Sequence, residues 1–94
     1  MLIRFWVYNC LVYTYEFTSK ALKQIKKLDK GTQRKIIEKI KFYCKEELFV
    51  RAEHLSDFKI GNYRFRIGSY RVVFDIDGKM LTILKVGHRR EIYK

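Results

Sequence analysis

Arginines recur at alternate positions in the C-terminal third of the chain, where their guanidinium groups could bind a phosphate. Arg64 and Arg66 precede the pair Gly68-Ser69, and Arg71 follows it. If Gly68-Ser69 is a two-residue hairpin loop, Arg66 lies opposite Arg71 and all three arginines share one face. Like charges directly opposite each other destabilise a strand pair, whereas the planar guanidinium group binds phosphate bidentately. The spacing predicts a polyanion site with Asp75 as the acidic residue in reach, and an ordinary solvated sheet face is the alternative.

The same part of the chain is expected to form three strands joined by two tight turns. The second turn, Asp77-Gly78, is a strong hairpin signal because a type I′ turn needs positive φ at both central positions. Counting outward from it pairs Ile76 with Lys79 and Phe74 with Leu81. Alternation then gives an apolar face with Tyr63, Phe65, Ile67, Tyr70, Val72, Phe74, Leu81 and Ile83, and a second face with Arg64, Arg66, Arg71, Val73, Thr82, Leu84 and Val86, with His88 as a further candidate.

Two helices are expected before these strands. The first is capped by Thr18 or Ser19 and ends near Asp29, and the second is capped by Thr32 and covers residues 33–48. Each helix carries apolar residues at helical spacing, which can cover the apolar face of the strands. The stripes are Ala21, Leu22, Ile25 and Leu28 in the first helix, and Ile36, Ile37, Ile40, Tyr43, Cys44 and Leu48 in the second.

A further strand is expected over Val12–Phe17, while residues 49–60 follow no regular pattern. His54 lies in this irregular stretch, and we assign it no role. The sequence therefore predicts a single α+β domain over residues 1–94. It has an N-terminal strand, a two-helix hairpin and a three-stranded antiparallel meander, with the helices packed on one face of the sheet.

Charge and composition limit the partners. The 94 residues suffice for one small domain, and 21 Lys and Arg against 10 Asp and Glu give a net charge of +11. Such a charge favours nucleic acid, an anionic membrane or an acidic protein as partner. The chain has no proline and few glycines, so no disordered linker is expected.

The N-terminal residues 1–10 form an atypical apolar extension. The apolar run reaches only to Tyr15, which is short for a membrane span of about 20 residues, and it lacks the features of a signal peptide. We therefore expect a cytoplasmic protein with no membrane partner. The extension could lengthen the following strand, dock on a partner or a second copy, or reflect an upstream start codon. Cys10 and Cys44 lack the spacing of metal ligands and are expected to be free thiols, and a Cys10–Cys44 disulfide would require an exported chain.

Two motifs carry a family resemblance. They are GNYRFRIGSYRVVF at residues 61–74 and VGHRREIY at residues 86–93. Together with the order of strand, two helices and meander, they resemble the RelE/ParE toxin superfamily, and more closely its RelE-like branch of mRNA interferases. The resemblance covers the chain from about Val12 to its end and leaves residues 1–10 outside.

The resemblance implies the toxin of a type II toxin–antitoxin system, a ribosome-dependent endoribonuclease that inhibits translation. Its partners would be mRNA, the ribosome and a RelB-like antitoxin, with no metal, cofactor or small-molecule ligand. In such cleavage the 2′-OH attacks the adjacent phosphate, so a proton must be accepted, charge stabilised and the 5′-oxygen protonated. We expect Arg66, Arg71, His88, Arg89 and Tyr93 to be catalytic, and Arg64, Lys85 and Arg90 to bind RNA.

Proton transfer is where this chain departs from the family pattern. Arg64 and Arg66 stand where relatives often have lysine, and arginine cannot readily give up a proton. Histidine side chains can exchange a proton near neutral pH, so His88 is the first candidate for acid or base, with Tyr93 as the second. Two other functions stay open: a ParE-like inhibitor of DNA gyrase, and a basic RNA-binding member without catalysis.

Overall fold

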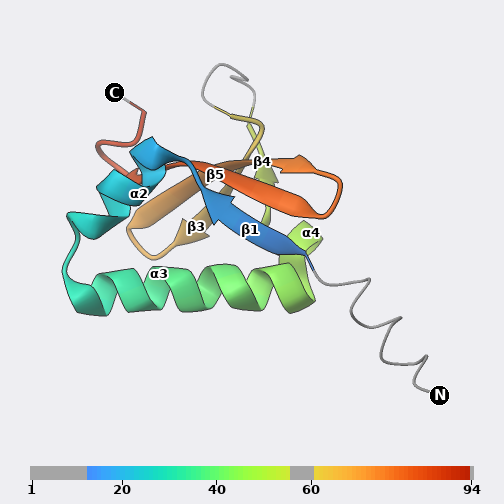
Figure 1. Ribbon diagram of the computed structural model, residues 1–94, viewed down its shortest axis with the longest axis horizontal. Coiled ribbons are helices and arrows are strands. Elements are labelled where there is room, and N and C mark those ends of the chain that lie inside the picture. Colours follow the sequence, from blue (N-terminus) through green and yellow to red (C-terminus); the bar gives the residue numbers. More distant parts are fainter. Residues whose placement is uncertain (1–12, 56–60, 94) are drawn as a thin grey trace.

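The chain folds as a five-stranded sheet with helices packed on one face, so the predicted α+β fold is confirmed (Figure 1). The computed structural model describes residues 13–55 and 61–93. The predictions for residues 1–10, for Cys10 and for a strand start at Val12 fall outside these residues. The elements are β1 (Thr14–Phe17), α2 (Ser19–Lys26), α3 (Lys30–Phe42), the π-helical turn η1 (Tyr43–Glu47), α4 (Leu48–Arg51), β2 (Glu53–His54), β3 (Tyr63–Ile67), β4 (Tyr70–Asp77) and β5 (Met80–His88).

The sheet contains one strand that the sequence did not indicate. Its order is β1-β5-β4-β3-β2, with β1 parallel to β5 and the other pairs antiparallel. The additional strand, β2, has two residues, and it pairs Glu53 with Arg64 and His54 with Tyr63. His54, for which the sequence indicated no regular element, therefore lies in a strand. A two-residue strand shows no alternation, so its pairing could not be read from hydrophobic periodicity.

Side-chain caps fix the starts of both long helices. The Thr18 hydroxyl accepts a hydrogen bond from the Ala21 amide, as predicted for the first helix. The predicted Thr32 cap of the second helix is wrong, because Asp29 takes that position. The Asp29 carboxylate accepts hydrogen bonds from the amide and the hydroxyl of Thr32, which lower its pKa. The second helix accordingly begins at Lys30 and changes to a π-helical turn after Phe42.

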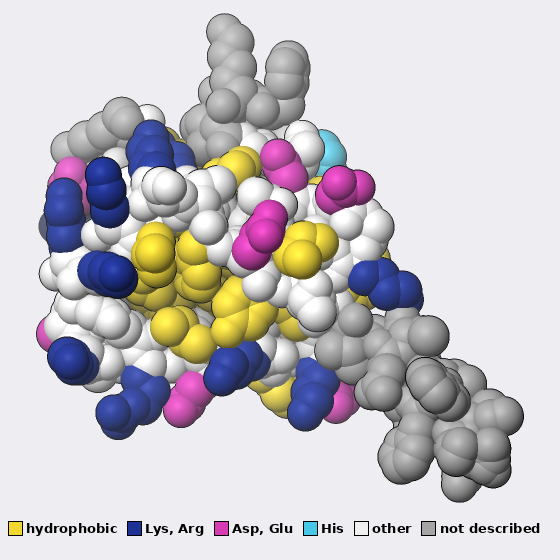
Figure 2. Space-filling view, in the orientation of Figure 1, with side chains coloured by type: hydrophobic (Ala, Val, Ile, Leu, Met, Phe, Trp, Pro, Cys, Tyr) yellow, Lys and Arg dark blue, Asp and Glu magenta, His cyan; other side chains and the backbone are white. Residues whose placement is uncertain are grey.

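The core lies between the helices and the predicted apolar face of the sheet. Phe65 and Phe74 are fully buried there, with ring centroids 4.4 Å apart. Hydrophobic side chains also reach the surface between α2, α3 and β1, where Lys and Arg side chains border them (Figure 2). Among the described residues no polar or charged residue is buried. The core residues are Ala21, Ile25, Ile36, Ile40, Tyr43, Cys44, Leu48, Phe65, Ile67, Val72, Phe74, Leu81, Ile83 and Val86.

The two hairpins of the meander differ in how well their register could be predicted. In β3–β4 the predicted pairing is confirmed. In β4–β5 the predicted pairing is wrong, because the loop is Gly78-Lys79 and pairs Asp77 with Met80. Gly78 has φ +63° and no non-glycine residue among those described has positive φ, so the turn has the type II′ pattern rather than type I′.

A β-bulge further along β5 changes which face its last residues occupy. Phe74 pairs with Ile83 but Val73 pairs with Lys85, which leaves Leu84 as the extra residue. Val86 therefore enters the core, and the prediction that it shares the arginine face is wrong. His88 shifts in the same way and pairs with Tyr70, on the face that carries the helices.

Two further findings concern the described helices and Cys44. None of the helices in residues 13–55 and 61–93 combines the length and apolar character needed to cross a membrane. Cys44 is a buried free thiol, and desolvation raises its pKa to about 11.

Candidate nucleic-acid interface

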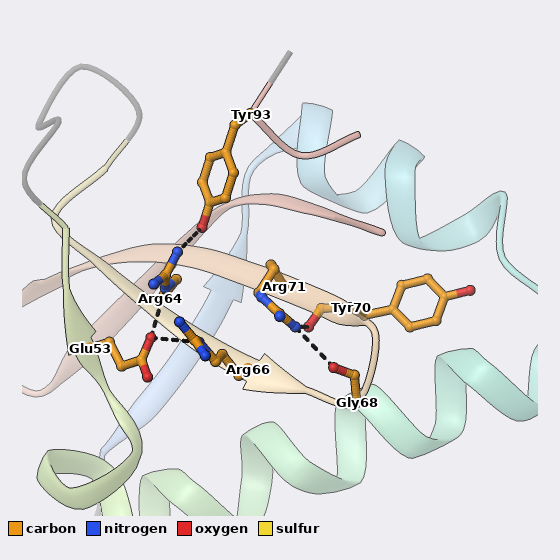
Figure 3. Close-up of polar contacts among 7 residues, drawn as sticks. All are labelled: Glu53, Arg64, Arg66, Gly68, Tyr70, Arg71 and Tyr93. Carbon is orange, nitrogen blue, oxygen red and sulfur yellow. Dashed lines mark hydrogen bonds and ion pairs between the residues drawn. The ribbon is translucent and has the colours of Figure 1, made fainter. Parts of the chain in front are cut away.

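Three arginines lie together on the sheet face opposite the core, as the alternation predicted (Figure 3). Arg66 is directly opposite Arg71 across β3–β4, and Arg64 is opposite Val73. The Arg64 side chain is 23% exposed and the Arg66 side chain 55% exposed. We call Arg64, Arg66 and Arg71 the arginine cluster. Its side chains are open to solvent on one side, so a polyanion can reach them.

The acidic partner of this cluster is Glu53 in β2, which the sequence analysis missed. One carboxylate oxygen of Glu53, Oε1, accepts hydrogen bonds from Arg64 Nε at 2.8 Å and from Arg66 Nε at 2.9 Å. The hydrogen bond from Arg64 and the nearby positive charges lower the pKa of Glu53. Asp75, the acidic residue predicted to be in reach, instead accepts the Asn62 amide at 2.8 Å.

Backbone carbonyls rather than a carboxylate hold Arg71. Its Nη1 donates to the carbonyl oxygens of Gly68 and Tyr70, each at 2.9 Å. Desolvation lowers the pKa of Arg71, and the charges of Arg66, Arg64 and Arg89 act in the same direction. Among the described residues no carboxylate is bonded to Arg71, so its positive charge is held in a fixed position that suits the binding of a phosphate.

The C-terminal turn brings Tyr93 into contact with the cluster. Ile92 is 2% exposed and packs over Gly87, where an added β-carbon would lie 3.4 Å from Ile92 Cδ1. Lys85 Nζ donates to the Ile92 carbonyl oxygen at 2.8 Å. The Tyr93 hydroxyl accepts a hydrogen bond of 2.6 Å from Arg64 Nη1, and Arg64 Cζ is 5.8 Å from the centre of the Tyr93 ring. The hydroxyl hydrogen of Tyr93 is therefore directed away from Arg64 and can be donated elsewhere.

The structure separates His88 from the arginine cluster. The His88 ring makes an edge-to-face contact with the Tyr70 ring on the helix-bearing face, with ring centroids 5.6 Å apart. Its Nδ1 accepts the backbone amide of Arg90 at 3.1 Å, so His88 helps to form the C-terminal turn. A catalytic role for His88 stays a prediction, but its ring lies on the other side of the sheet from Arg64 and Arg66.

Arg89 and Arg90 follow His88 and differ in their relation to the cluster. The Arg89 amide donates to the Ser69 carbonyl oxygen at 2.7 Å, and its charge contributes to the lowered pKa of Arg71. Arg90 is exposed, and among the described contacts none joins its side chain to the cluster. Of the predicted RNA-binding residues, Arg64 therefore belongs to the cluster, Lys85 supports the C-terminal turn, and Arg90 is part of that turn through its backbone amide.

The backbone at Gly61 packs closely against the sheet beside the arginine cluster. A β-carbon at Gly61 would lie 2.4 Å from Val73 Cγ1 and 3.1 Å from Leu84 Cδ1. These two side chains form an apolar area beside the arginine cluster, and Val73 is completely buried. The cluster is thus bordered by the Gly61 backbone on one side and by the C-terminal turn on another.

This arrangement can hold a phosphodiester and stabilise added negative charge on it. Several guanidinium groups converge, and the Tyr93 hydroxyl lies within hydrogen-bonding distance of one of them. Within the described ranges, no three His, Cys, Asp or Glu side chains are grouped so that they could hold a metal ion.

Comparison with known proteins places these features in a family context. The family model described as the ParE toxin of type II toxin–antitoxin systems, parDE, matches residues 15–93. No curated protein sequence matches the chain at a significant level.

Solved structures of toxins and toxin–antitoxin complexes have the same fold. The toxin–antitoxin complex RelBE2 from Mycobacterium tuberculosis matches with a TM-score of 0.71 and 28% identity, over 83% of this chain and 99% of that one. A mutant of the E. coli toxin RelE in the free state matches with a TM-score of 0.66 and 26% identity, over 87% and 90%. An archaeal RelE–RelB complex from Pyrococcus horikoshii matches with a TM-score of 0.63 and 20% identity, over 86% and 98%, and supports the fold alone.

Proposed function

Because the chain belongs to the ParE toxin family of type II toxin–antitoxin systems, within the RelE/ParE superfamily, we propose that it is an endoribonuclease that cleaves mRNA on the ribosome. The toxin would act in the cytoplasm and inhibit translation. The observation that carries the proposal is the arginine cluster on one open face, in contact with Tyr93. Guanidinium groups and a phenolic hydroxyl that meet on one face suit the binding of a phosphodiester.

In the proposed reaction the 2′-OH gives its proton to a water molecule and the 2′-oxygen attacks the adjacent phosphorus. The bond from phosphorus to the 5′-oxygen breaks, that oxygen takes up a proton, and a 2′,3′-cyclic phosphate and a 5′-hydroxyl result. Arg66, Arg71 and Arg89 would stabilise the negative charge that grows on the phosphate oxygens. Such preorganised positive charge contributes several kcal/mol in other enzymes, of the order of 3–4 kcal/mol for a single donor.

Proton transfer falls more naturally to Tyr93 than to His88 in this geometry. The Tyr93 hydroxyl lies at the edge of the cluster, where Arg64 donates to its oxygen, so its own hydrogen is available for the leaving 5′-oxygen. His88 lies across the sheet and uses Nδ1 within the C-terminal turn. We therefore propose Tyr93 as the proton donor and as a surface on which a base can stack.

Cleavage of translated mRNA tests this proposal. Wild type, Arg71→Ala and Tyr93→Phe would be compared in a translating extract, with Arg34→Ala as the control. Arg34 is an exposed arginine on α3, on the other side of the sheet, so its variant removes the same charge away from the cluster. Wild type and Arg34→Ala should cleave, and Arg71→Ala should cleave about 100-fold more slowly or worse. No cleavage by wild type, or equal cleavage by all four proteins, contradicts the proposal.

A second candidate function is inhibition of DNA gyrase, which the match to the ParE toxin model favours. A supercoiling assay separates the two functions, because gyrase inhibition without mRNA cleavage supports the second. RNA binding without either effect would indicate a non-catalytic member.

We also propose that the partner is a RelB-like antitoxin with acidic residues. The similar RelBE2 structure is a toxin–antitoxin complex, and a net charge of +11 suits an acidic partner.

A further inference from the structure

We propose that Glu53 is an internal competitor for the RNA phosphate: its carboxylate occupies the guanidinium edges of Arg64 and Arg66 that the phosphate must take. The inference rests on the proposed function, since it assumes that the arginine cluster binds RNA. It goes further by assigning a role to a residue in β2 that belongs to neither predicted set.

The geometry of the contact is that of an anion between two cations. A single oxygen, Oε1, bridges Arg64 Nε at 2.8 Å and Arg66 Nε at 2.9 Å, and Figure 3 shows both bonds converging on it. A phosphate oxygen binds arginine through the same N–H groups and at the same range of distances. Glu53 therefore stands where a phosphate oxygen of bound RNA would lie.

Strand pairing explains why this carboxylate is there. Glu53 pairs with Arg64 across β2–β3, and Arg66 is two residues further along the same face of β3. Without an anion, Arg64 and Arg66 would repel each other and also Arg71, which lies opposite Arg66. Glu53 relieves this repulsion in the free protein and holds the two side chains parallel, so it is also a positioning residue.

Arg71 provides an internal contrast. Neutral carbonyl oxygens hold its guanidinium group, and they cannot compete for phosphate as a charged carboxylate does. RNA would therefore bind first at Arg71, and would have to displace Glu53 to engage Arg64 and Arg66. Among the described residues, Glu53 is the carboxylate bonded to the cluster, so removing its charge should strengthen RNA binding.

The experiment compares Glu53→Gln with a matched control, Glu47→Gln. Glu47 also pairs with an arginine, with its Oε1 3.0 Å from Arg51 Nε, and its side chain is 35% exposed against 42% for Glu53. Both variants remove one negative charge, but Glu47 lies at the junction of η1 and α4, away from the cluster. A third variant, Glu53→Asp, keeps the charge and shortens the side chain.

Binding of a labelled single-stranded RNA oligonucleotide would be measured by fluorescence anisotropy over a range of salt concentrations. We expect Glu53→Gln to bind several-fold more tightly than wild type. Its slope of log K against log salt should be steeper by about 0.7, the value for one additional phosphate contact on a single strand. Glu47→Gln should stay near wild type, whereas Glu53→Asp, which keeps the charge but reaches less far, should fall between wild type and Glu53→Gln. In the translating extract, Glu53→Gln should lower KM without raising kcat, because Arg64 and Arg66 lose the group that aligns them.

Each outcome bears on the proposal. If wild type binds RNA and Glu53→Gln binds no more tightly, or gains no more than Glu47→Gln does, the competitor role is overturned while the proposed function stands. If neither wild type nor Glu53→Gln binds RNA, the competitor role and the RNA-binding part of the proposed function both fail. Thermal unfolding of Glu53→Gln, followed by circular dichroism, verifies that the variant is folded during the binding measurement.

Discussion

The two faces of the sheet are made by the same strands and have opposite chemistry. On the helix-bearing face, Phe65, Phe74 and Leu81 are fully buried. On the other face, Arg64 and Arg66 remain exposed to solvent and share the Glu53 carboxylate. Alternation with a period of two residues lets each strand serve both purposes. The helix-bearing face supplies most of the free energy of folding. The opposite face can therefore carry charges that repel one another.

The largest expected effect comes from the core side of this comparison. Phe74→Ala removes a ring whose centroid lies 4.4 Å from that of Phe65 and 5.8 Å from that of Tyr63. The lost burial and the resulting cavity should lower the free energy of unfolding by about 3–5 kcal/mol. Urea unfolding followed by circular dichroism measures this change.

The control for that prediction is Arg66→Ala on the exposed face. Arg66 is more than half exposed and its ion pair with Glu53 is at the surface, so its removal should change the free energy of unfolding by less than about 1 kcal/mol. A similar loss of stability in both variants would show that the two faces do not divide stability and function in this way.

Substitution of Gly61 should have an intermediate effect on stability, because Gly61 lies on the arginine side of the sheet but next to a buried side chain. It is on the arginine side of the sheet, yet a β-carbon there would come within 2.4 Å of Val73 Cγ1, a buried side chain. Gly61→Ala must move Val73 or the backbone, and Gly61 also has φ +156°, which other residues rarely adopt, so the change should cost about 1–3 kcal/mol of stability. Urea unfolding would show it. Gly78→Ala serves as a reference, because an added β-carbon at Gly78 meets nothing within 4 Å and only its φ of +63° opposes the change. If Gly61→Ala is as stable as wild type, the close approach of Gly61 to Val73 relaxes without cost and does not constrain this side of the sheet.

The sequence was a good guide to the alternation of side chains along the strands and a poor guide to the bulge that interrupts it. The face assignments of Arg64, Arg66, Phe65 and Phe74 follow from a period of two residues and are confirmed. The bulge at Leu84 breaks that period, and no turn residue marks it, so Val86 was assigned to the wrong face.

The candidate site was predictable where it depends on one hairpin and not where it depends on distant segments. Arg66 opposite Arg71 follows from counting across Gly68-Ser69. The contact of Glu53 with the cluster depends on a two-residue strand, and residues 56–60, which the structure does not describe, separate that strand from β3. Similarly, the position of His88 depends on the bulge, which local pattern does not reveal.

Titration of Cys44 tests the helix-bearing face and has the smallest expected effect. The core face excludes charge so strongly that burial raises the pKa of the Cys44 thiol from 9.0 to about 11. Since the folded pKa is above the unfolded one, the stabilisation is complete below about pH 9 and is lost as pH rises toward 11. We therefore compare Cys10→Ser with Cys10→Ser/Cys44→Ala, so that other titrating groups cancel. The stability advantage of the protein that keeps Cys44 should shrink by about 1 kcal/mol between pH 8.5 and pH 10. A constant difference over this range would mean that the Cys44 thiol ionises as readily in the folded protein as in the unfolded chain, and hence that the helix-bearing face is accessible to charge.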